Sequence, residues 1–242
     1  MASKRVLVLR TGSAPPAVCA RFGDFDAWFA ALLAPVVETV AADAGPGHPL
    51  PDLWDVGGVV VTGSLASVTA PAPWMDRLGR WLVDAGARVP VLGVCFGHQL
   101  LAHALGGRVE RNPRGPEVGT HEVELTDAGR RDPLFDALPP RLAVQQNHED
   151  HVSSPPPGAV VLARNPHSPV QAFAHGPRIR AVQFHPEFDA RRNRAFTEGD
   201  REPLDAARPG LADEALASIR ETPEAATILA TWATRFVIGR TS

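Results

Sequence analysis

Cys95 is the residue of this sequence whose setting best suits chemistry. It lies in Gly93-Val94-Cys95-Phe96-Gly97, with one glycine two positions before it and another two positions after it. The apolar run Val89–Val94 has the length and β-branching of a buried strand. Apolar residues at helical spacing then continue to the pair Gly106-Gly107, which supplies a stop signal. The order strand, sharp turn, helix therefore places Cys95 at the turn.

A cysteine at such a turn suits nucleophilic catalysis. The backbone of a tight strand-to-helix turn is strained, and flanking glycines relieve the crowding around it. The side chain projects from the carboxyl end of the strand, where open α/β sheets place their ligands. The helix N-terminus behind it favours thiolate over thiol and can hold an oxyanion. The alternative is a buried structural cysteine, which is common by residue type alone; the two glycines favour the nucleophile.

The segment Ile179–Phe188, IRAVQFHPEF, carries the candidate partners of this thiol. Apolar strand residues continue to Phe184, and Pro186 ends the strand because proline cannot donate to a ladder. His185 and Glu187 lie two positions apart, on the same side of an extended chain. A carboxylate beside an imidazole fixes its tautomer and stabilises its protonated form. Cysteine, histidine and glutamate thus make a nucleophile, a base and an orienting group.

Two other polar stretches have more than one interpretation. Thr62-Gly63-Ser64 follows the predicted strand Gly57–Val61 and either points backbone N–H groups at an anion or simply ends the strand. The run Gln145–His151 holds two histidines and two carboxylates, which are metal-ligand types. No cysteine pair and no His-Glu-x-x-His helix accompany it, so we expect no metal there. A loop lining the site, or a solvated turn, is the interpretation favoured for this run.

Composition excludes several classes of protein. The chain has 242 residues, a hydrophobic share of 44% and a net charge of −3, which give no sign of nucleic-acid binding. Two cysteines, Cys19 and Cys95, do not suggest a disulfide framework and fit a reducing cytosol. We find no secretion signal and no run of 18 apolar residues, so we expect a cytoplasmic protein that does not enter a membrane.

The order of the predicted elements indicates an α/β fold. Strands alternate with helices up to Gly107, which implies a parallel sheet with right-handed crossovers. Beyond Gly107, short strands among proline, glycine and charged residues suggest an antiparallel extension. Residues 41–52 read as a loop, and Arg21–Asp24 as a polar loop before a helix. The expected strands are Arg5–Leu9, Gly57–Val61, Val89–Val94, Val160–Ala163, Val170–Phe173 and Ile179–Phe184; the expected helices are Phe25–Val37, ended or kinked by Pro35, Trp74–Ala85, and one opened by Thr222-Pro223-Glu224.

These residues together resemble the class I (triad) glutamine amidotransferases, above all the glutaminase domain of GMP synthase and its free-standing relatives. The segments that match are GVCFGHQ at 93–99, Thr62-Gly63-Ser64 and VQFHPE at 182–187, with weaker likeness at 117–119 and 147–150. The resemblance covers roughly residues 5–188. It implies a three-layer α/β/α fold with a mostly parallel central sheet.

The resemblance also assigns roles to residues. It implies that Cys95 is the nucleophile, His185 the base and acid, and Glu187 the orienting group. The remaining implied residues are the oxyanion hole at Gly63, Ser64 and Phe96, and the substrate-binding side chains Gln99 and His148. No cofactor and no metal is implied. By the same resemblance, the expected substrate is glutamine or a γ-glutamyl amide, cleaved through a glutamyl thioester.

The sequence departs from the GMP synthase pattern after residue 188. No ATP-pyrophosphatase domain follows, and neither its glycine-serine loop nor a Walker motif occurs. We expect residues 1–188 to be the catalytic domain and 189–242 a C-terminal helical extension packed on it. Arg191, Arg192 and Arg194 of this extension are expected to face solvent, although one of these arginines could meet a substrate carboxylate.

Three functions remain open from the sequence. The chain is a stand-alone hydrolase that removes a γ-glutamyl group from an amine, or a glutaminase that supplies ammonia to a separate synthase, or an inactive scaffold. The missing synthase domain and the long private C-terminal segment favour a self-sufficient enzyme. Retention of Cys95, His185 and Glu187 together argues against a scaffold.

Overall fold

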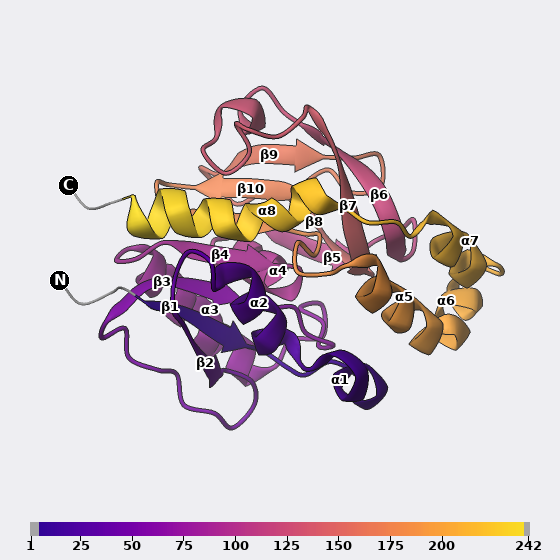
Figure 1. Cartoon of the computed structure of the whole chain (residues 1–242), viewed down its shortest axis with the longest axis horizontal. Helices are drawn as coiled ribbons and strands as arrows, with labels where there is room; N and C mark the ends of the chain where they lie inside the picture. The colour runs from indigo at the N-terminus through magenta and orange to yellow at the C-terminus, as the bar shows by residue number, and fades with distance from the viewer. Residues whose placement is uncertain (1–4, 240–242) are drawn as a thin grey trace.

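Most strands of the protein join one large sheet (Figure 1). The structure is a computed structural model that describes residues 5–239. Its strands are β1 (Arg5–Arg10), β2 (Thr39–Asp43), β3 (Val56–Val61), β4 (Val91–Val94), β5 (Arg108–Arg111), β6 (Glu117–Leu125), β7 (Arg141–His148), β8 (Asp150–Ser154), β9 (Val160–Arg164), β10 (Ala172–His175) and β11 (Ile179–Val182). Its helices are α1 (Pro16–Phe22), α2 (Phe25–Leu33), α3 (Pro73–Gly86), α4 (Phe96–Ala104), α5 (Ala190–Gly199), α6 (Arg201–Ala207), α7 (Leu211–Ser218) and α8 (Pro223–Trp232). A 3-10 helix, η1 (Gly129–Arg131), and a π-helix, η2 (Ala233–Ile238), complete the set.

The sheet has a parallel half and an antiparallel half. Its order is β2-β1-β3-β4-β11-β10-β9-β6-β7, and the neighbours from β2 to β11 run parallel. From β11 to β7 each neighbouring pair is antiparallel, while β5 and β8 form a separate ribbon. The antiparallel extension predicted beyond Gly107 is therefore part of the same sheet.

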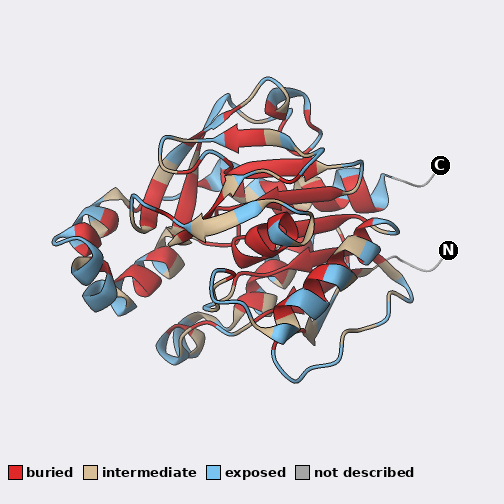
Figure 2. Ribbon diagram, turned by 180° about the vertical axis from the view of Figure 1, so that it is seen from behind, coloured by how far each residue is buried: buried red, intermediate tan, exposed pale blue. Residues whose placement is uncertain are grey.

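Helices cover both faces of the sheet, which gives the predicted three-layer α/β arrangement. Along β1, Val6 and Val8 enter a core with α2 and α8, whereas Leu7 and Leu9 enter the opposite core with α3 and α4. This division follows from the two-residue period of a strand. Figure 2 shows the strands buried along most of their length, as expected for a sheet covered on both sides.

The remaining helices gather beyond the carboxyl end of β1. α5, α6 and α7 lie together there with α1 (Figure 1). A small buried apolar cluster joins these helices to the sheet; it includes Val118 of β6, Leu204 of α6 and Leu211 of α7. Helix α8 begins at Pro223 after Thr222, as predicted, and covers one face of the sheet.

Several local predictions were wrong, for reasons visible in the packing. Strand β2 occupies Thr39–Asp43, so the predicted loop at 41–52 begins too early. The residues of β2 are half-buried or exposed because β2 is an edge strand. Arg21 and Phe22 belong to α1 rather than to a polar loop, and Asp24 caps α2. Strand β11 ends at Val182, two residues before the predicted end at Phe184. Beyond residue 188 a helical segment was expected, but α5, α6 and α7 were not located within it.

Candidate active site

Cys95 occupies a strained turn between β4 and α4. Its backbone has φ 52° and ψ −103°, a left-handed conformation that is rare for a residue with a side chain. It caps α4 directly, so the thiol lies at the helix N-terminus. The two glycines are sterically required: a Cβ at Gly93 would lie 2.6 Å from the Gly97 carbonyl oxygen, and one at Gly97 would lie 2.7 Å from the Val61 carbonyl oxygen.

The sheet brings His185 to this turn. β4 and β11 are parallel neighbours with Val94 opposite Val182, and the Cys95 N–H donates to the Val182 carbonyl oxygen at 2.9 Å. Cys95 follows Val94 by one residue, and His185 follows Val182 by three. Both side chains therefore lie at the carboxyl end of the parallel strands. A Cβ added at Gly63 would lie 3.0 Å from His185 Cε1 and 3.8 Å from Cys95 Cβ, so both flank Gly63.

Glu187 holds the far nitrogen of the imidazole. The distance from His185 Nδ1 to Glu187 Oε1 is 2.7 Å, and both side chains are buried. Phe188 stacks on the ring with centroids 4.1 Å apart, and the backbone N–H of His185 donates to the Gln145 carbonyl oxygen. These contacts fix the orientation of the ring, leaving its other nitrogen for the thiol.

The charges at this site favour the protonated imidazole. Burial alone would lower the pKa of His185, but the negative charges of Glu187 and of the Cys95 thiolate, with hydrogen bonds to both, raise it to about 10. An imidazole with that pKa keeps its proton at neutral pH. The arrangement can therefore keep a proton on His185 and deliver it to a leaving amine.

The turn after β3 faces the thiol from the neighbouring strand. Ser64 Oγ donates to the Thr11 carbonyl oxygen at 3.0 Å and accepts from the Ala66 N–H, so its hydroxyl is used to hold the turn. Ser64 lines the same cavity as Cys95 and Phe96. The structure thus gathers the three predicted oxyanion-hole residues, Gly63, Ser64 and Phe96, around Cys95.

A cavity of about 740 Å³ opens on one side of Cys95. Its walls come from the turn after β3, from Phe96 and Gln99 of α4, from the end of β7 and the start of β8, and from α6. Ser67 and Thr69 donate to the Asp150 carboxylate, which ties the turn after β3 to β8. The volume lies in the range of ordinary small-molecule sites.

Gln99 and His148 lie in the walls of this cavity and are held by other residues. Gln99 Nε2 donates to the Asp150 carbonyl oxygen at 2.8 Å and to Gln183 Oε1 at 3.2 Å. His148 Nε2 lies 3.0 Å from Glu117 Oε2, and its Nδ1 lies 2.9 Å from the Asp150 carbonyl oxygen. Both side chains are buried and brace α4, β7 and β8 behind the cavity.

Glu117 is the buried charge that orders this region. Burial raises its pKa, but hydrogen bonds from His148 and Asn165 and the charge of His148 outweigh it and lower the pKa to about 2. Gln171 donates to the same carboxylate at 2.8 Å and accepts from Gln146. Of the polar run 145–151, most side chains are thus engaged in hydrogen bonds, and residues 147–150 line the cavity. Residues 5–239 contain no group of three or more side chains placed to bind a metal.

A smaller space of about 50 Å³ adjoins this cavity, and Cys95 lines both. It is the space that His185 borders, and Asp200 borders it as well as the larger cavity. Three aromatic rings, from Phe25, Phe188 and Phe196, form its apolar wall.

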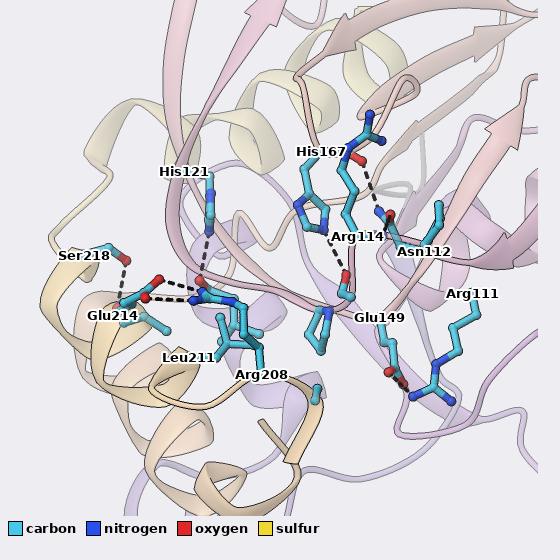
Figure 3. A pocket seen from close by; sticks show the side chains of 16 residues that line it. Arg111, Asn112, Arg114, His121, Glu149, His167, Arg208, Leu211, Glu214 and Ser218 are labelled. Atoms are coloured by element: carbon cyan, nitrogen blue, oxygen red, sulfur yellow. Dashed lines mark hydrogen bonds and ion pairs between the residues drawn. The ribbon is translucent and has the colours of Figure 1, made fainter. Parts of the chain in front are cut away.

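A second cleft, also of about 740 Å³, adjoins the cavity at Cys95 (Figure 3). The two share a wall that includes Arg111 and Glu149, which form an ion pair. On the opposite wall Arg208 is paired with Glu214. No triad candidate lines this cleft. The C-terminal arginines lie elsewhere: Arg192 sits over Trp28, Arg191 over Phe22, and neither they nor Arg194 line the cavity at Cys95.

Comparison with known proteins identifies the family. Residues 38–198 match the family described as glutamine amidotransferase class-I. The chain is 43% identical over 152 residues to the glutamine-hydrolysing GMP synthase of Aeropyrum pernix, an alignment covering 63% of this chain and 27% of that protein. It is 35% identical over 143 residues to a glutamine-hydrolysing GMP synthase subunit of Saccharolobus solfataricus, covering 59% and 73%. This chain belongs to the class I glutamine amidotransferases.

Solved structures agree on the fold. A glutamine amidotransferase from Methylobacillus flagellatus aligns with a TM-score of 0.73 at 24% identity, over 97% of this chain and 96% of that one. A glutamine amidotransferase from Thermotoga maritima aligns with a TM-score of 0.70 at 23% identity, over 99% and 98%. The chain spans only 23–27% of the length of the first GMP synthases it matches. Within residues 5–239, no helix has the length and apolar character needed to cross a bilayer.

The cavity also contains residues that no sequence pattern singled out. Asp200, Pro203 and Leu204 come from the junction of α5 and α6, beyond the segment that resembles the family. They join no motif, and their place beside Cys95 depends on how α5 turns back over β7. Only the tertiary fold identifies them.

Proposed function

We propose that the chain hydrolyses the side-chain amide of glutamine, giving glutamate and ammonia through a glutamyl thioester on Cys95. The observation that carries this proposal is the meeting of Cys95, His185 and Glu187 at the carboxyl ends of β4 and β11. Membership of the class I glutamine amidotransferases supports it.

In the first half of the reaction, the Cys95 thiolate attacks the amide carbon and forms a tetrahedral oxyanion. Backbone N–H groups of Gly63, Ser64 and Phe96 would hold that oxyanion, where losing one donor costs about 10²–10³ in rate. The imidazolium of His185 then gives its proton to the amide nitrogen. The C–N bond breaks, ammonia leaves, and the glutamyl group stays on sulfur as a thioester.

In the second half, neutral His185 takes a proton from water, and the hydroxide adds to the thioester carbonyl. The C–S bond breaks, glutamate leaves, and the thiolate–imidazolium pair is restored. Glu187 keeps Nδ1 of the ring protonated throughout, so that the other nitrogen faces the reaction. The chain's own residues thus supply every proton transfer.

Similarity to glutamine-hydrolysing GMP synthases supports glutamine as the substrate, and therefore ammonia as the leaving group. The sequence alone favoured an enzyme that releases a larger amine.

The similarity to free-standing GMP synthase subunits supports a partner for the ammonia. We propose that a separate synthase receives it, because those relatives are named as one part of a larger enzyme. A catalytic thiol must stay reduced, which favours a cytoplasmic location.

A panel of amides tests the substrate. We expect glutamate release from glutamine to exceed release from γ-glutamyl amides of larger amines by at least about tenfold in kcat/KM, corresponding to about 1.4 kcal/mol in the transition state. Preference for a bulky γ-glutamyl amide would overturn the ammonia assignment while leaving the thioester chemistry in place.

A further inference from the structure

The ring of His148 faces a hydrogen-bond acceptor on each side. Nδ1 lies 2.9 Å from the Asp150 carbonyl oxygen, and Nε2 lies 3.0 Å from Glu117 Oε2. A carbonyl oxygen can only accept a hydrogen bond, so Nδ1 carries a proton. Whether Nε2 carries one as well depends on the state of Glu117, because a carboxylate accepts from the ring whereas a carboxylic acid can donate to it.

Glu117 is a carboxylate, because amide donors occupy both of its oxygens. Asn165 Nδ2 donates to Oε1, and Gln171 Nε2 donates to Oε2 at 2.8 Å. The carbonyl oxygens of these two amides accept other hydrogen bonds, which fixes the direction in which each amide points. Burial opposes ionisation, yet the pKa of Glu117 is lowered to about 2. Nε2 of His148 therefore donates too, and the ring is an imidazolium.

The groups around this imidazolium are consistent with a single buried cation. Burial, followed by the positive charge of His148, lowers the pKa of His98 to about 3, and the same two effects lower the pKa of His151. The carboxylate of Asp150 is occupied by two hydroxyl donors from the turn after β3. Glu117 supplies the negative charge in contact with the ring, and the side chains of the pair are 0% and 2% exposed.

The imidazolium holds a wall of the catalytic cavity in place. The Asp150 carbonyl oxygen accepts from His148 and also from Gln99 Nε2, which joins the start of β8 to the end of β7 and to α4. Residues 147–150 line the cavity together with Cys95, and the Asn147 carbonyl oxygen lies 3.9 Å from Cys95 Sγ. A hydrogen bond from a charged donor is stronger than one from a neutral donor. The charge on the ring therefore makes this wall more rigid.

We propose that Glu117 and His148 form a buried ion pair that positions residues 147–150 at the catalytic cavity. His148 is then a positioning residue, because both of its ring nitrogens are engaged within the protein. The kinetic consequence of this proposal rests on the proposed function, since it concerns the binding of glutamine. The charge on the ring does not, and it can be measured without substrate.

NMR spectroscopy tests the charge on the ring. In the full chain labelled with ¹⁵N and ¹³C, the ring of His148 is assigned through its backbone resonances, and the ¹⁵N shifts show which ring nitrogens carry protons. At pH 7 an ordinary histidine is mostly neutral, whereas we expect both nitrogens of His148 to be protonated. A neutral His148 ring in the wild-type chain at pH 7 would overturn the ion pair.

Glu117→Gln tests the positioning role, because it keeps the shape of the side chain and removes its charge. At pH 7 the His148 ring should lose one proton. The KM for glutamine should rise by about tenfold or more, as expected when a hydrogen bond to a charged group is weakened, while kcat changes by less than about threefold. Loss of folded protein alone would lower kcat and leave KM unchanged, so this split separates positioning from stability.

Two further variants complete the test. Glu122→Gln is the matched control, because it removes an exposed carboxylate from the same strand, β6; it should leave the His148 ring and KM unchanged. His148→Gln cannot carry a charge and should raise KM as Glu117→Gln does. It decides the positioning role if Glu117→Gln does not fold.

The results separate this proposal from the proposed function. A ring that stays protonated in Glu117→Gln, or a KM that is unchanged in Glu117→Gln and His148→Gln, would overturn the positioning ion pair. Failure of the wild-type chain to release glutamate from glutamine would instead overturn the proposed function, while the NMR result would still decide whether the ion pair exists.

Discussion

His185 and Glu187, the proposed base and orienting group, come from one tripeptide. Strand β11 ends at Val182, and the chain beyond it turns so that the Glu187 carboxylate lies 2.7 Å from His185 Nδ1. The aromatic face of Phe188 then covers the ring. This local geometry is encoded within four consecutive residues, which is why it is readable from the sequence.

Replacing Glu187 with glutamine tests the role of this carboxylate. Loss of its charge removes the larger of the two charge effects that raise the pKa of His185, so the pKa falls from about 10. The imidazolium then loses its proton at lower pH, so the alkaline limb of the kcat/KM profile should move to lower pH. We expect kcat to fall by about 10²- to 10⁴-fold. Profiles of kcat/KM against pH for both proteins measure the effect; superimposable profiles would contradict it.

The turn between β4 and α4 is an element whose sequence is dictated by close packing. Gly97 allows α4 to lie against β3, and Gly93 allows the first turn of α4 to lie against β4. The strained φ of Cys95 is maintained because both of its neighbouring elements are fixed in the core.

Gly97→Ala should therefore damage both stability and catalysis. Its Cβ would lie 2.7 Å from a backbone oxygen of β3, which cannot move aside cheaply. We expect a loss of about 1–3 kcal/mol in the free energy of unfolding, and about 10²-fold in activity from the displaced thiol. Urea denaturation and glutamate release measure the two effects. Gly199→Ala is the control, since nothing lies within 4 Å of a Cβ there; equal behaviour of the two variants would refute the packing argument.

The parallel half of the fold was predictable because its signals are local. Apolar runs, glycines and the alternation of strands with helices mark β1, β3, β4 and α3 along the chain. The edge strand β2 was missed because its residues are half-exposed and carry no alternation that points to a core. The bounds of α5, α6 and α7 could not be predicted because these helices are short and polar. Their positions depend on packing against β6 and α1.

The candidate site divides in the same way. Cys95, His185 and Glu187 belong to motifs, so their types and spacing were sufficient to choose them. Asp200 and the turn residues Ser67 and Thr69 carry no motif, and their placement depends on contacts between segments far apart in the chain. Gln99 and His148 were predicted to bind substrate, which stays a prediction; both line the cavity, but their hydrogen bonds to Asp150 could not be foreseen.

The molecule as a whole depends on its C-terminal segment. Helix α8 and η2 cover the sheet face formed by Val6, Val8 and Val60, and α6 forms a wall of the catalytic cavity. We propose that residues 1–188 are the catalytic part and 189–242 an extension of the same folding unit. A single cooperative unfolding transition is the expected result.

Trp232→Ala tests that dependence. Trp232 is fully buried, and a Cβ at Gly58 of β3 would lie 2.9 Å from its ring. Truncation should lower the free energy of unfolding by about 3–5 kcal/mol. Trp54 is 86% exposed, so Trp54→Ala should change the free energy of unfolding by less than about 0.5 kcal/mol. Urea denaturation compares the two; a Trp232 effect as small as that of Trp54 would mean that the segment is not part of the folding unit.

Covalent capture of the acyl intermediate is the most direct test of the catalytic assignment. The wild-type chain would be mixed with glutamine, quenched in acid within a turnover, and digested for mass spectrometry. We predict a glutamyl group on the peptide that contains Cys95, and neither this adduct nor glutamate release in Cys95→Ser. Glutamate release that continues in Cys95→Ser would contradict the account.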